Sequence, residues 1–301
     1  MSNKHPPDLS VVIPSVNGWA DLEGALNAVF AQIGGVTLEV LVVERVGESV
    51  RTALRHSFPK ATVIGVSSKV TIPQMRAMAF EVAQAEIIGV IEDHVIVPCD
   101  WAQRMLAAHS AGAQVVGGSV DNGATGSIVD WAAFLCEYGH CLTPPPCGPA
   151  PWVTGNNVTY RKSLLRQFCA TLRLGRWENV LHDAFRSGGI ALISEPAIQV
   201  EHKKHYSVGE YVSQRYFYSR SYAAIRVMDA PLGKRMAYGF ASFVLPPVIY
   251  WRVISQVLKS GRYQFELLRS LPLLAVFAVS WSVGEIAGYW FGDGGALARV
   301  R

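Results

Sequence analysis

Two carboxylates and an imidazole stand together directly after an apolar run of the sequence. The run covers residues 87–91, and Glu92, Asp93 and His94 follow it. A short apolar run of this kind is typical of a buried strand, and carboxylate oxygens at its end suit a hard divalent cation. Glu92, Asp93 and His94 could therefore coordinate such a cation together. An acidic turn is also common on a solvated surface, so the rest of the sequence must decide between the two interpretations.

The elements that must position these residues follow from the periodicity of apolar side chains. Residues 9–13, 38–43 and 61–66 are short apolar runs that predict further buried strands. Apolar residues spaced by three and four between residues 22 and 30 predict a helix with one apolar face, and residues 75–85 are good helix formers. Strands that alternate with helices indicate βαβ units with a mainly parallel sheet, so the sequence predicts an α/β fold.

Polar residues also follow the first two predicted strands. Pro14, Ser15 and Asn17 come after the first strand, and Glu44 comes after the second. In open parallel sheets, ligands bind beyond the carboxyl ends of the strands. The residues after the first strand match neither GxGxxG nor GxxxxGK[ST]. A nucleotide bound at this edge would therefore need a metal ion to hold its phosphates.

The composition limits the class of protein. The 301 residues carry 27 Lys and Arg against 23 Asp and Glu, a net charge of +4, and half of them are apolar. This excludes an intrinsically disordered chain and argues against a dedicated nucleic-acid binder. A mean hydropathy of +0.22 with 17% charged residues instead predicts contact with a membrane. The N-terminus lacks the apolar region of a secretory signal, and the cysteines are expected to be reduced and mostly buried thiols of a cytosolic domain. These are Cys99, Cys136, Cys141, Cys147 and Cys169.

Two apolar stretches near the C-terminus are the candidates for that contact. Residues 271–290 reach the length of roughly 20 residues that crosses a bilayer, whereas residues 237–251 are shorter and contain Pro246 and Pro247. If both stretches crossed, the basic residues between them would lie on the far side, against the positive-inside rule. Membrane spans, an in-plane or re-entrant hairpin, and a pair of buried helices therefore all remain open. The basic residues are Lys259, Arg262 and Arg269.

Taken in order, the motifs resemble family-2 glycosyltransferases of the GT-A fold. Four segments carry the likeness, and a fifth matches the family's acidic base motif, helix, strand and trailing histidines. The likeness extends from residue 9 to about residue 226. It implies transfer of a sugar from a nucleotide-diphospho-sugar to an acceptor hydroxyl, with inversion by a single displacement and with Mn²⁺ or Mg²⁺ as cofactor. The segments are residues 9–32, 38–44, 73–101, 152–165 and 177–205.

The resemblance implies roles for particular residues. Glu178 would be the catalytic base, and Gly155, Asn156 and Asn157 would lie on the acceptor side. The metal would be held by Asp93 and His94, with Glu92, His202 and His205 as further candidates. Residues implied to bind the donor are Pro14, Ser15, Asn17, Glu44, Arg76, Glu92 and Asp93.

Several of these residues depart from the family pattern. Glu44 stands where Asp is usual, and Asn179 follows Glu178 where a second carboxylate is usual. His94 replaces the final Asp of the DxD motif, which favours metal ions that accept nitrogen ligands. Simpler interpretations also exist, because Glu178 could serve only the helix dipole and the Gly-Asn-Asn segment could be an ordinary turn.

The sequence therefore predicts a GT-A catalytic domain over residues 1–230 and a C-terminal membrane-associated or transmembrane hairpin over residues 231–301. We expect the enzyme at the cytoplasmic membrane, with its catalytic domain facing the cytosol and a lipid-linked or cell-envelope glycan as acceptor. The basic and aromatic residues 206–226 would suit a membrane surface or a lipid-linked phosphate, or would pack inside the protein. The alternative function is a non-catalytic sugar-nucleotide-binding scaffold at the membrane, which the altered motifs favour.

Overall fold

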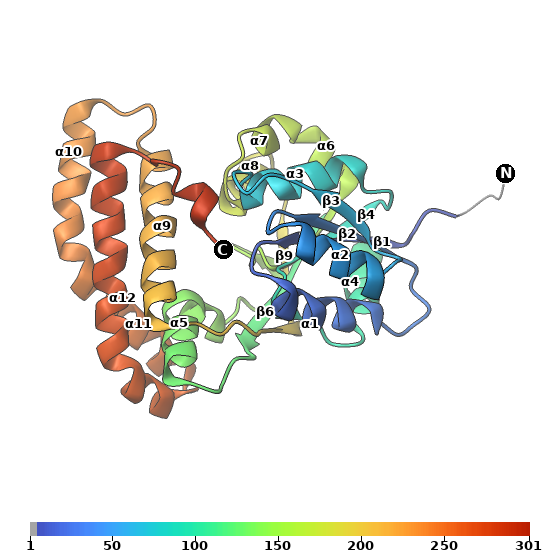
Figure 1. Ribbon diagram of the computed structural model, residues 1–301, viewed down its shortest axis with the longest axis horizontal. Helices are drawn as coiled ribbons and strands as arrows, with labels where there is room; N and C mark the ends of the chain where they lie inside the picture. Colours follow the sequence, from blue (N-terminus) through green and yellow to red (C-terminus); the bar gives the residue numbers. More distant parts are fainter. Residues whose placement is uncertain (1–4) are drawn as a thin grey trace. The chain divides into compact units, whose positions relative to one another are not determined.

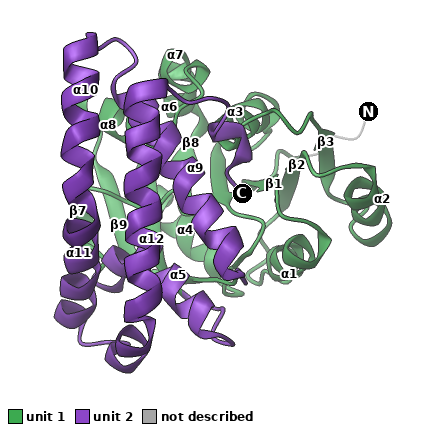
Figure 2. Cartoon of the chain, turned by 60° about the vertical axis from the view of Figure 1, so that its left-hand side comes forward, with its two compact units in different colours: residues 1–121, 144–203 green, residues 122–143, 204–301 purple. Residues whose placement is uncertain are grey.

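The computed structural model describes residues 5–301, which divide into two compact units (Figures 1 and 2). Unit 1 comprises the residues up to 121 together with 144–203, and unit 2 comprises residues 122–143 and 204–301. The predicted boundary at residue 230 concerns where the catalytic region ends, and it stays a prediction. The structural division places residues 204–230 with the C-terminal helices.

Unit 1 is built on one mixed sheet. Its strands are β1 (Leu9–Ser15), β2 (Leu38–Glu44), β3 (Thr62–Gly65), β4 (Ile87–Ile91), β5 (Val95–Ile96), β6 (Val115–Asn122), β7 (Gly148–Ala150), β8 (Asn157–Arg161) and β9 (Leu192–His202). Their order is β3-β2-β1-β4-β8-β6-β9-β5, and β7 pairs with β9. The strands β3, β2, β1 and β4 are parallel, whereas β8 runs antiparallel to both β4 and β6. The predicted α/β fold with its parallel strands is confirmed.

Helices flank this sheet (Figure 1). They are α1 (Trp19–Phe30), α2 (Glu48–Ser57), α3 (Ile72–Val82), α4 (Trp101–Ser110), α6 (Lys162–Gln167), α7 (Cys169–Arg173) and α8 (Glu178–Ser187). Helix α3 begins three residues earlier than predicted, because Thr71 and Gln74 form a capping box around its first turn. Arg76 lies in the second turn of this helix, and its side chain is buried.

The register of the central strands brings the predicted site residues to one edge. Every residue of β1 and β4 is buried, as expected for parallel strands covered on both faces. Ser15 pairs in register with Glu44, and Val12 pairs with Val90. The carboxyl ends of β1, β2 and β4 therefore lie beside one another, and the residues that follow them share that edge.

His109 on α4 is a buried histidine that fixes the helix to the sheet. Its Nδ1 lies 2.9 Å from the carbonyl oxygen of Ala113, and its Nε2 lies 2.8 Å from the hydroxyl of Thr159 on β8. Burial lowers the pKa of His109 to about 4; the backbone hydrogen bond at Ala113 opposes this shift and the charge of Arg161 adds to it. The folded protein therefore holds His109 neutral.

This histidine should make folding sensitive to acid. An unfolded histidine has a pKa near 6.5, so between about pH 6.5 and 4 the unfolded chain binds a proton that the folded chain excludes. The stabilisation from neutral His109 is complete above about pH 6.5 and is lost as the pH falls toward 4, on the order of 3 kcal/mol. Urea unfolding followed between pH 7 and 4.5 should show a shallower loss of stability for His109→Gln. Equal slopes for the two proteins would contradict this assignment.

Unit 2 is helical. Its helices are α5 (Ile128–Tyr138), η1 (Gly139–Leu142), α9 (Val208–Arg226), α10 (Leu232–Ala241), η2 (Ser242–Val244), α11 (Leu245–Ser260), α12 (Gln264–Phe291) and η3 (Leu297–Arg299). Two helical segments, Leu232–Ser260 and Gln264–Phe291, are long and apolar enough to cross a membrane, with mean hydropathies of 1.3 and 1.6. Pro246 and Pro247 occupy the first turn of α11, where proline is tolerated. These helices weakly suggest association with a membrane.

The basic and aromatic helix predicted around residues 206–226 is α9, and part of its aromatic face is packed inside unit 2. Arg215 is buried, and its Nη2 lies 2.9 Å from a carboxylate oxygen of Glu137 on α5. Its guanidinium also lies over the rings of Tyr211, Tyr218 and Trp281, at 4.9, 5.2 and 5.5 Å. For these residues the structure favours packing over contact with a membrane or a lipid phosphate.

The cysteines depart from the expected burial. All five are free thiols, and only Cys141 is buried, while Cys99, Cys147 and Cys169 are exposed. The prediction of mostly buried thiols is therefore wrong. Cys99 and Cys147 lie in connecting segments outside the strands and helices, and Cys169 begins the short helix α7.

Candidate active site

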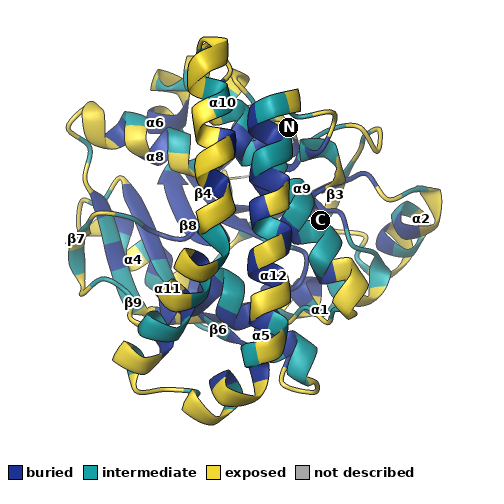
Figure 3. Cartoon of the chain, turned by 90° about the vertical axis from the view of Figure 1, so that its left-hand side faces the viewer, coloured by how far each residue is buried: buried dark blue, intermediate teal, exposed yellow. Residues whose placement is uncertain are grey.

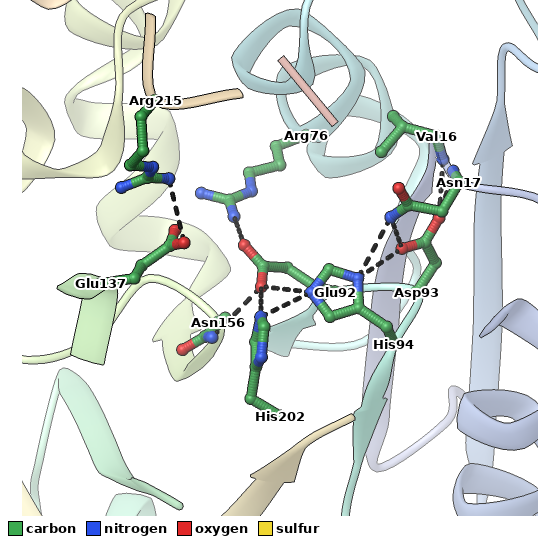
Figure 4. A network of polar contacts seen from close by, with 10 residues as sticks. All are labelled: Val16, Asn17, Arg76, Glu92, Asp93, His94, Glu137, Asn156, His202 and Arg215. Atoms are coloured by element: carbon green, nitrogen blue, oxygen red, sulfur yellow. Dashed lines mark hydrogen bonds and ion pairs between the residues drawn. The ribbon is translucent and has the colours of Figure 1, made fainter. Parts of the chain in front are cut away.

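Asp93 is the most firmly anchored side chain at the end of β4 (Figure 4). Its Oδ2 accepts the backbone N–H groups of Val16 at 2.7 Å and Asn17 at 2.9 Å. Its Oδ1 accepts the side-chain amide of Asn17 at 2.7 Å and lies 2.9 Å from Nδ1 of His94. Burial raises the pKa of Asp93, but hydrogen bonds and the charge of His94 outweigh burial and lower it. Asp93 therefore ties the ends of β1 and β4 together and orients the His94 ring.

Glu92, His94 and His202 form a candidate cation site. One ligand atom from each of the three lies within 4.8 Å of the others. The Nε2 atoms of His94 and His202 face each other at 2.8 Å, and Glu92 Oε2 lies 3.4 Å and 4.0 Å from them. His202 is the last residue of β9 and pairs in register with Val95 of β5, the residue that follows His94, so this pairing brings it to the turn after β4. The three residues come from two distant parts of the chain and point at one spot (Figure 4).

The charges of this cluster are strongly coupled. Burial raises the pKa of Glu92, but the hydrogen bond with His94 and the charges of His94, His202 and Arg76 lower it to about 2. Burial lowers the pKa of His94, but the bonds to Asp93 and Glu92 raise it to about 10. These shifts favour a protonated His94 beside an ionised Glu92. A cation would compete for the same lone pairs.

Arg76 connects this cluster to Glu178. Its Nη1 donates to Glu178 Oε2 at 2.8 Å, and its Nη2 lies 3.9 Å from Glu92 Oε1. Glu178 is the first residue of α8 and keeps 28% of its side chain exposed. A Cβ atom added to Gly155 would lie 2.2 Å from the carboxyl carbon of Glu178, so only glycine leaves room for this carboxylate. The predicted base is therefore partly exposed, is paired with a cation, and occupies space left by a glycine.

The two asparagines after Gly155 have different surroundings. Asn156 donates from Nδ2 to Glu92 Oε2 at 3.2 Å, which places it against the candidate cation site. Asn157 begins β8, accepts from the indole N–H of Trp101 at 2.9 Å, and donates both amide protons to backbone carbonyls of β6 and β9. Asn157 therefore holds strands together, while Asn156 belongs with the polar cluster.

The residues predicted to bind the donor line the edge formed by β1 and β2. Pro14 and Ser15 are buried at the end of β1, and the Ser15 hydroxyl has no hydrogen-bond partner among residues 5–301. Glu44 is buried, accepts the backbone N–H of Gly47 at 2.8 Å, and pairs with Arg51 Nε at 2.6 Å. Glu44 thus closes the turn into α2.

Two residues near Glu178 were not predicted from the sequence. The hydroxyl of Tyr160 on β8 lies 2.8 Å from His182 Nε2, and both side chains are buried. Burial lowers the pKa of His182 to about 4, Glu178 raises it and Arg76 lowers it. His182 lies one helical turn after Glu178, a spacing that could have indicated it; nothing in the sequence indicates Tyr160. The pair anchors α8 to the sheet beneath the carboxylate.

His205, a further candidate ligand, belongs to unit 2. Its Nδ1 lies 2.9 Å from Oδ2 of Asp130, and Oδ1 of the same carboxylate accepts the backbone N–H of Tyr206 at 3.0 Å. This arrangement is an internal contact of unit 2. The roles predicted for the individual site residues stay predictions.

Comparison with known proteins finds one family that matches part of the chain. Residues 10–140 match the family described as glycosyl transferase family 2. Over these residues the chain is similar to family-2 glycosyltransferases. The matched region includes β1, the Glu92-Asp93-His94 turn and the helix that carries Arg76, in the order predicted from the sequence.

The fold of this glycosyltransferase is also found in solved structures. S. aureus TarS, residues 1–349, aligns with a TM-score of 0.53 at 13% identity and covers 93% of this chain and 90% of that one. The mannosyltransferase PcManGT from Pyrobaculum calidifontis, solved in complex with GDP-Man and Mn²⁺, aligns with a TM-score of 0.49 at 17% identity and covers 91% and 76%. No protein among those curated for function matches the sequence. The family match supports the predicted glycosyltransferase function, and the likeness to TarS supports the predicted fold, while acceptor and mechanism stay predictions.

Proposed function

We propose that this glycosyltransferase moves a sugar from a nucleoside-diphosphate donor to an acceptor hydroxyl by a single displacement that inverts the anomeric carbon. The family match supports the donor class. The observation that carries the mechanism is the placement of Glu178 beside Arg76, which itself faces Glu92 of the candidate cation site. Glu178 would serve as the base, and the neighbouring cluster at the same edge of the sheet would receive the leaving diphosphate.

A divalent cation fits the residues of the cluster. Two buried imidazole nitrogens and one carboxylate oxygen converge, and Asp93 holds His94 from behind as a carboxylate often does for a metal-bound histidine. Glu92, His94 and His202 would hold the ion. When bound, it would neutralise charge that develops on the leaving diphosphate. We assign Asp93 the orienting role, because four donors already engage its oxygens.

The chain's own residues supply the other half of the reaction. The acceptor hydroxyl must lose a proton as it attacks, and a carboxylate within hydrogen-bond reach can take it. Glu178 fills this role with its exposed edge, while Arg76 and Gly155 fix its position. Asn156 would orient Glu92 and the sugar bound next to it. Ser15 and the turn closed by Glu44 would receive the nucleoside at the neighbouring strand ends.

We further propose that the acceptor is a lipid-linked or cell-envelope glycan and that the enzyme works at the cytoplasmic membrane with unit 1 in the cytosol. The two apolar helices of unit 2 support membrane association. A lipid-linked acceptor would be presented at such a surface.

A panel of UDP-, GDP- and dTDP-sugars, each with and without Mn²⁺, tests the donor class. We expect one nucleotide class to raise the melting temperature by about 5 °C or more at saturating concentration, and only in the presence of the cation. Release of the nucleoside diphosphate on addition of a membrane extract would then show turnover. A shift without any turnover would favour the non-catalytic scaffold, and no shift with any donor would refute the proposal.

A further inference from the structure

The helices α11 and α12 each expose one apolar stripe. On α11 the stripe is Val248, Trp251 and Leu258, at spacings of three and seven residues that return to one face of a helix. On α12, Val276 and Val283 lie on one face and are about half exposed. The opposite faces of both helices are buried inside unit 2. Figure 3 shows exposed residues along α10 and α12 on the same side of the unit.

The buried side of α12 packs directly on α9. Small residues recur every fourth position, and they let the two helix backbones approach closely. A Cβ atom added to Gly284 would lie 2.5 Å from the carbonyl oxygen of Tyr216, and one added to Gly288 would lie 2.3 Å from that of Arg220. Ser280 donates to the carbonyl oxygen of Val212 at 2.7 Å. The contact runs along the same part of α12 that is apolar enough to cross a membrane.

Because of this packing, α12 could not cross a bilayer without α9. The guanidinium of Arg215 lies 5.5 Å from the ring of Trp281, about halfway along the apolar stretch. Arg226 donates to the Tyr289 hydroxyl at 2.9 Å, and Arg220 donates to the carbonyl oxygen of Gly292 at 3.0 Å. Each arginine at the centre of a bilayer costs at least about 2.5 to 3.5 kcal/mol. Crossing would therefore place Arg215 of α9 near the bilayer centre, while Arg220 and Arg226 lie against the end of α12.

The segment α10–α11 is bound to the same bundle. Arg235 donates from Nε to the carbonyl oxygen of Tyr289 at 3.0 Å, and Ser282 donates to the carbonyl oxygen of Ser242 at 2.6 Å. These contacts pair the start of one candidate span with the end of the other. Neither candidate span can leave the bundle and cross alone without breaking them.

We propose that unit 2 is monotopic: the apolar stripes of α11 and α12 enter a single leaflet of an anionic lipid membrane, and neither helix crosses it. Helices that lie in the interface immerse their apolar face by about 5–10 Å. The exposed Trp251 suits the headgroup boundary. The bend between α11 and α12 carries Arg262, with Lys259 and Arg269 near it, and these cations would contact anionic headgroups on the entry side. This topology rests on the membrane association proposed above but not on the sugar chemistry.

Side-specific labelling of the full chain tests the topology. Arg262→Cys places a thiol in the exposed bend, and the exposed native Cys169 of unit 1 serves as the reference. Each would be the sole exposed cysteine of its variant, with the other exposed cysteines changed to Ser. An impermeant maleimide added to sealed membrane vesicles should label both thiols from the same side. Labelling from opposite sides would show a spanning hairpin and overturn the proposal.

Flotation of the purified protein with vesicles of phosphatidylglycerol and phosphatidylcholine tests the surface itself. Changing both Val248 and Trp251 to Asp should lower vesicle binding at least about tenfold. Val82→Asp and Leu174→Asp are matched controls, since these side chains are 52% and 56% exposed but belong to unit 1. Binding unchanged by the double substitution, or lost equally in the controls, would refute the leaflet contact. Donor binding measured on the same variants is a separate readout that reports on the proposed function.

Discussion

Replacing Glu178 by Gln should abolish sugar transfer while leaving the donor bound. The exchange keeps the size of the side chain and an oxygen that can accept from Arg76, but it removes the group that takes the proton. A positioned base typically contributes 10²- to 10⁴-fold, so we expect turnover to fall by about a thousandfold. The affinity for the sugar nucleotide should change by less than about threefold. Initial rates at saturating donor and donor-induced thermal shifts measure the two effects.

Asp183 provides a matched control on the same helix. It is another carboxylate of α8, its side chain is 63% exposed, and it pairs only locally with Arg186 at 2.5 Å among the described contacts. Asp183→Asn should keep most of the activity. If Glu178→Gln turns over at a rate close to that of the unchanged enzyme, or if Asp183→Asn is equally inactive, Glu178 is not the base.

The electrostatic role of Glu178 could not be read from its position in the sequence. A carboxylate at the start of a helix is expected for the helix dipole alone. What distinguishes this one is Arg76, 102 residues earlier, and the missing side chain of Gly155 beneath it. The ion pair with Arg76 joins α3 to the start of α8, and Gly155 comes from the segment before β8, which inserts antiparallel next to β4. Both are tertiary effects that local spacing does not encode.

The parallel part of the fold was predictable because its signal is local. Continuous apolar runs mark β1, β2 and β4, and polar residues follow each run, so the edge that they form follows from the general behaviour of parallel strands. The antiparallel strands gave weaker patterns: Asn157 begins β8 but looks in the sequence like its neighbour Asn156. Successive residues of an extended segment point to opposite sides. This alternation separates Asn157, which ties strands together, from Asn156, which lies near Glu92.

For Asp93, the sequence indicates the kind of site but not what the side chain does there. Sequence identifies a carboxylate in the metal motif, but the backbone N–H groups that saturate it come from the turn after β1, 76 and 77 residues away. The same geometry explains why a histidine is tolerated next to it. With Asp93 holding Nδ1 of His94, the Nε2 atom is left to face His202 and Glu92.

The candidate cation site offers two imidazole nitrogens and one carboxylate oxygen, and these ligands should determine which metal ion binds most tightly. Nitrogen ligands favour Mn²⁺, Co²⁺ or Zn²⁺ over Mg²⁺, which prefers oxygen. We expect the purified protein to bind Mn²⁺ at least about tenfold more tightly than Mg²⁺. Removing one of three ligands with His202→Ala should weaken Mn²⁺ binding by about a hundredfold and lower transfer at limiting Mn²⁺ to a similar degree. Calorimetric titration with each metal measures binding without reference to activity.

The variant His94→Asp restores an oxygen ligand and sharpens the test. If nitrogen at this position sets the metal preference, the substitution should reduce the difference in affinity between Mn²⁺ and Mg²⁺. The variant should still bind a metal ion. His109→Gln is the matched control, because His109 is also a buried histidine of unit 1 but bonds only to Ala113 and Thr159 among the described residues. Its metal affinity should be unchanged. Equal affinity of the unchanged protein for Mn²⁺ and Mg²⁺, or full Mn²⁺ binding by His202→Ala, would show that the ion is held elsewhere.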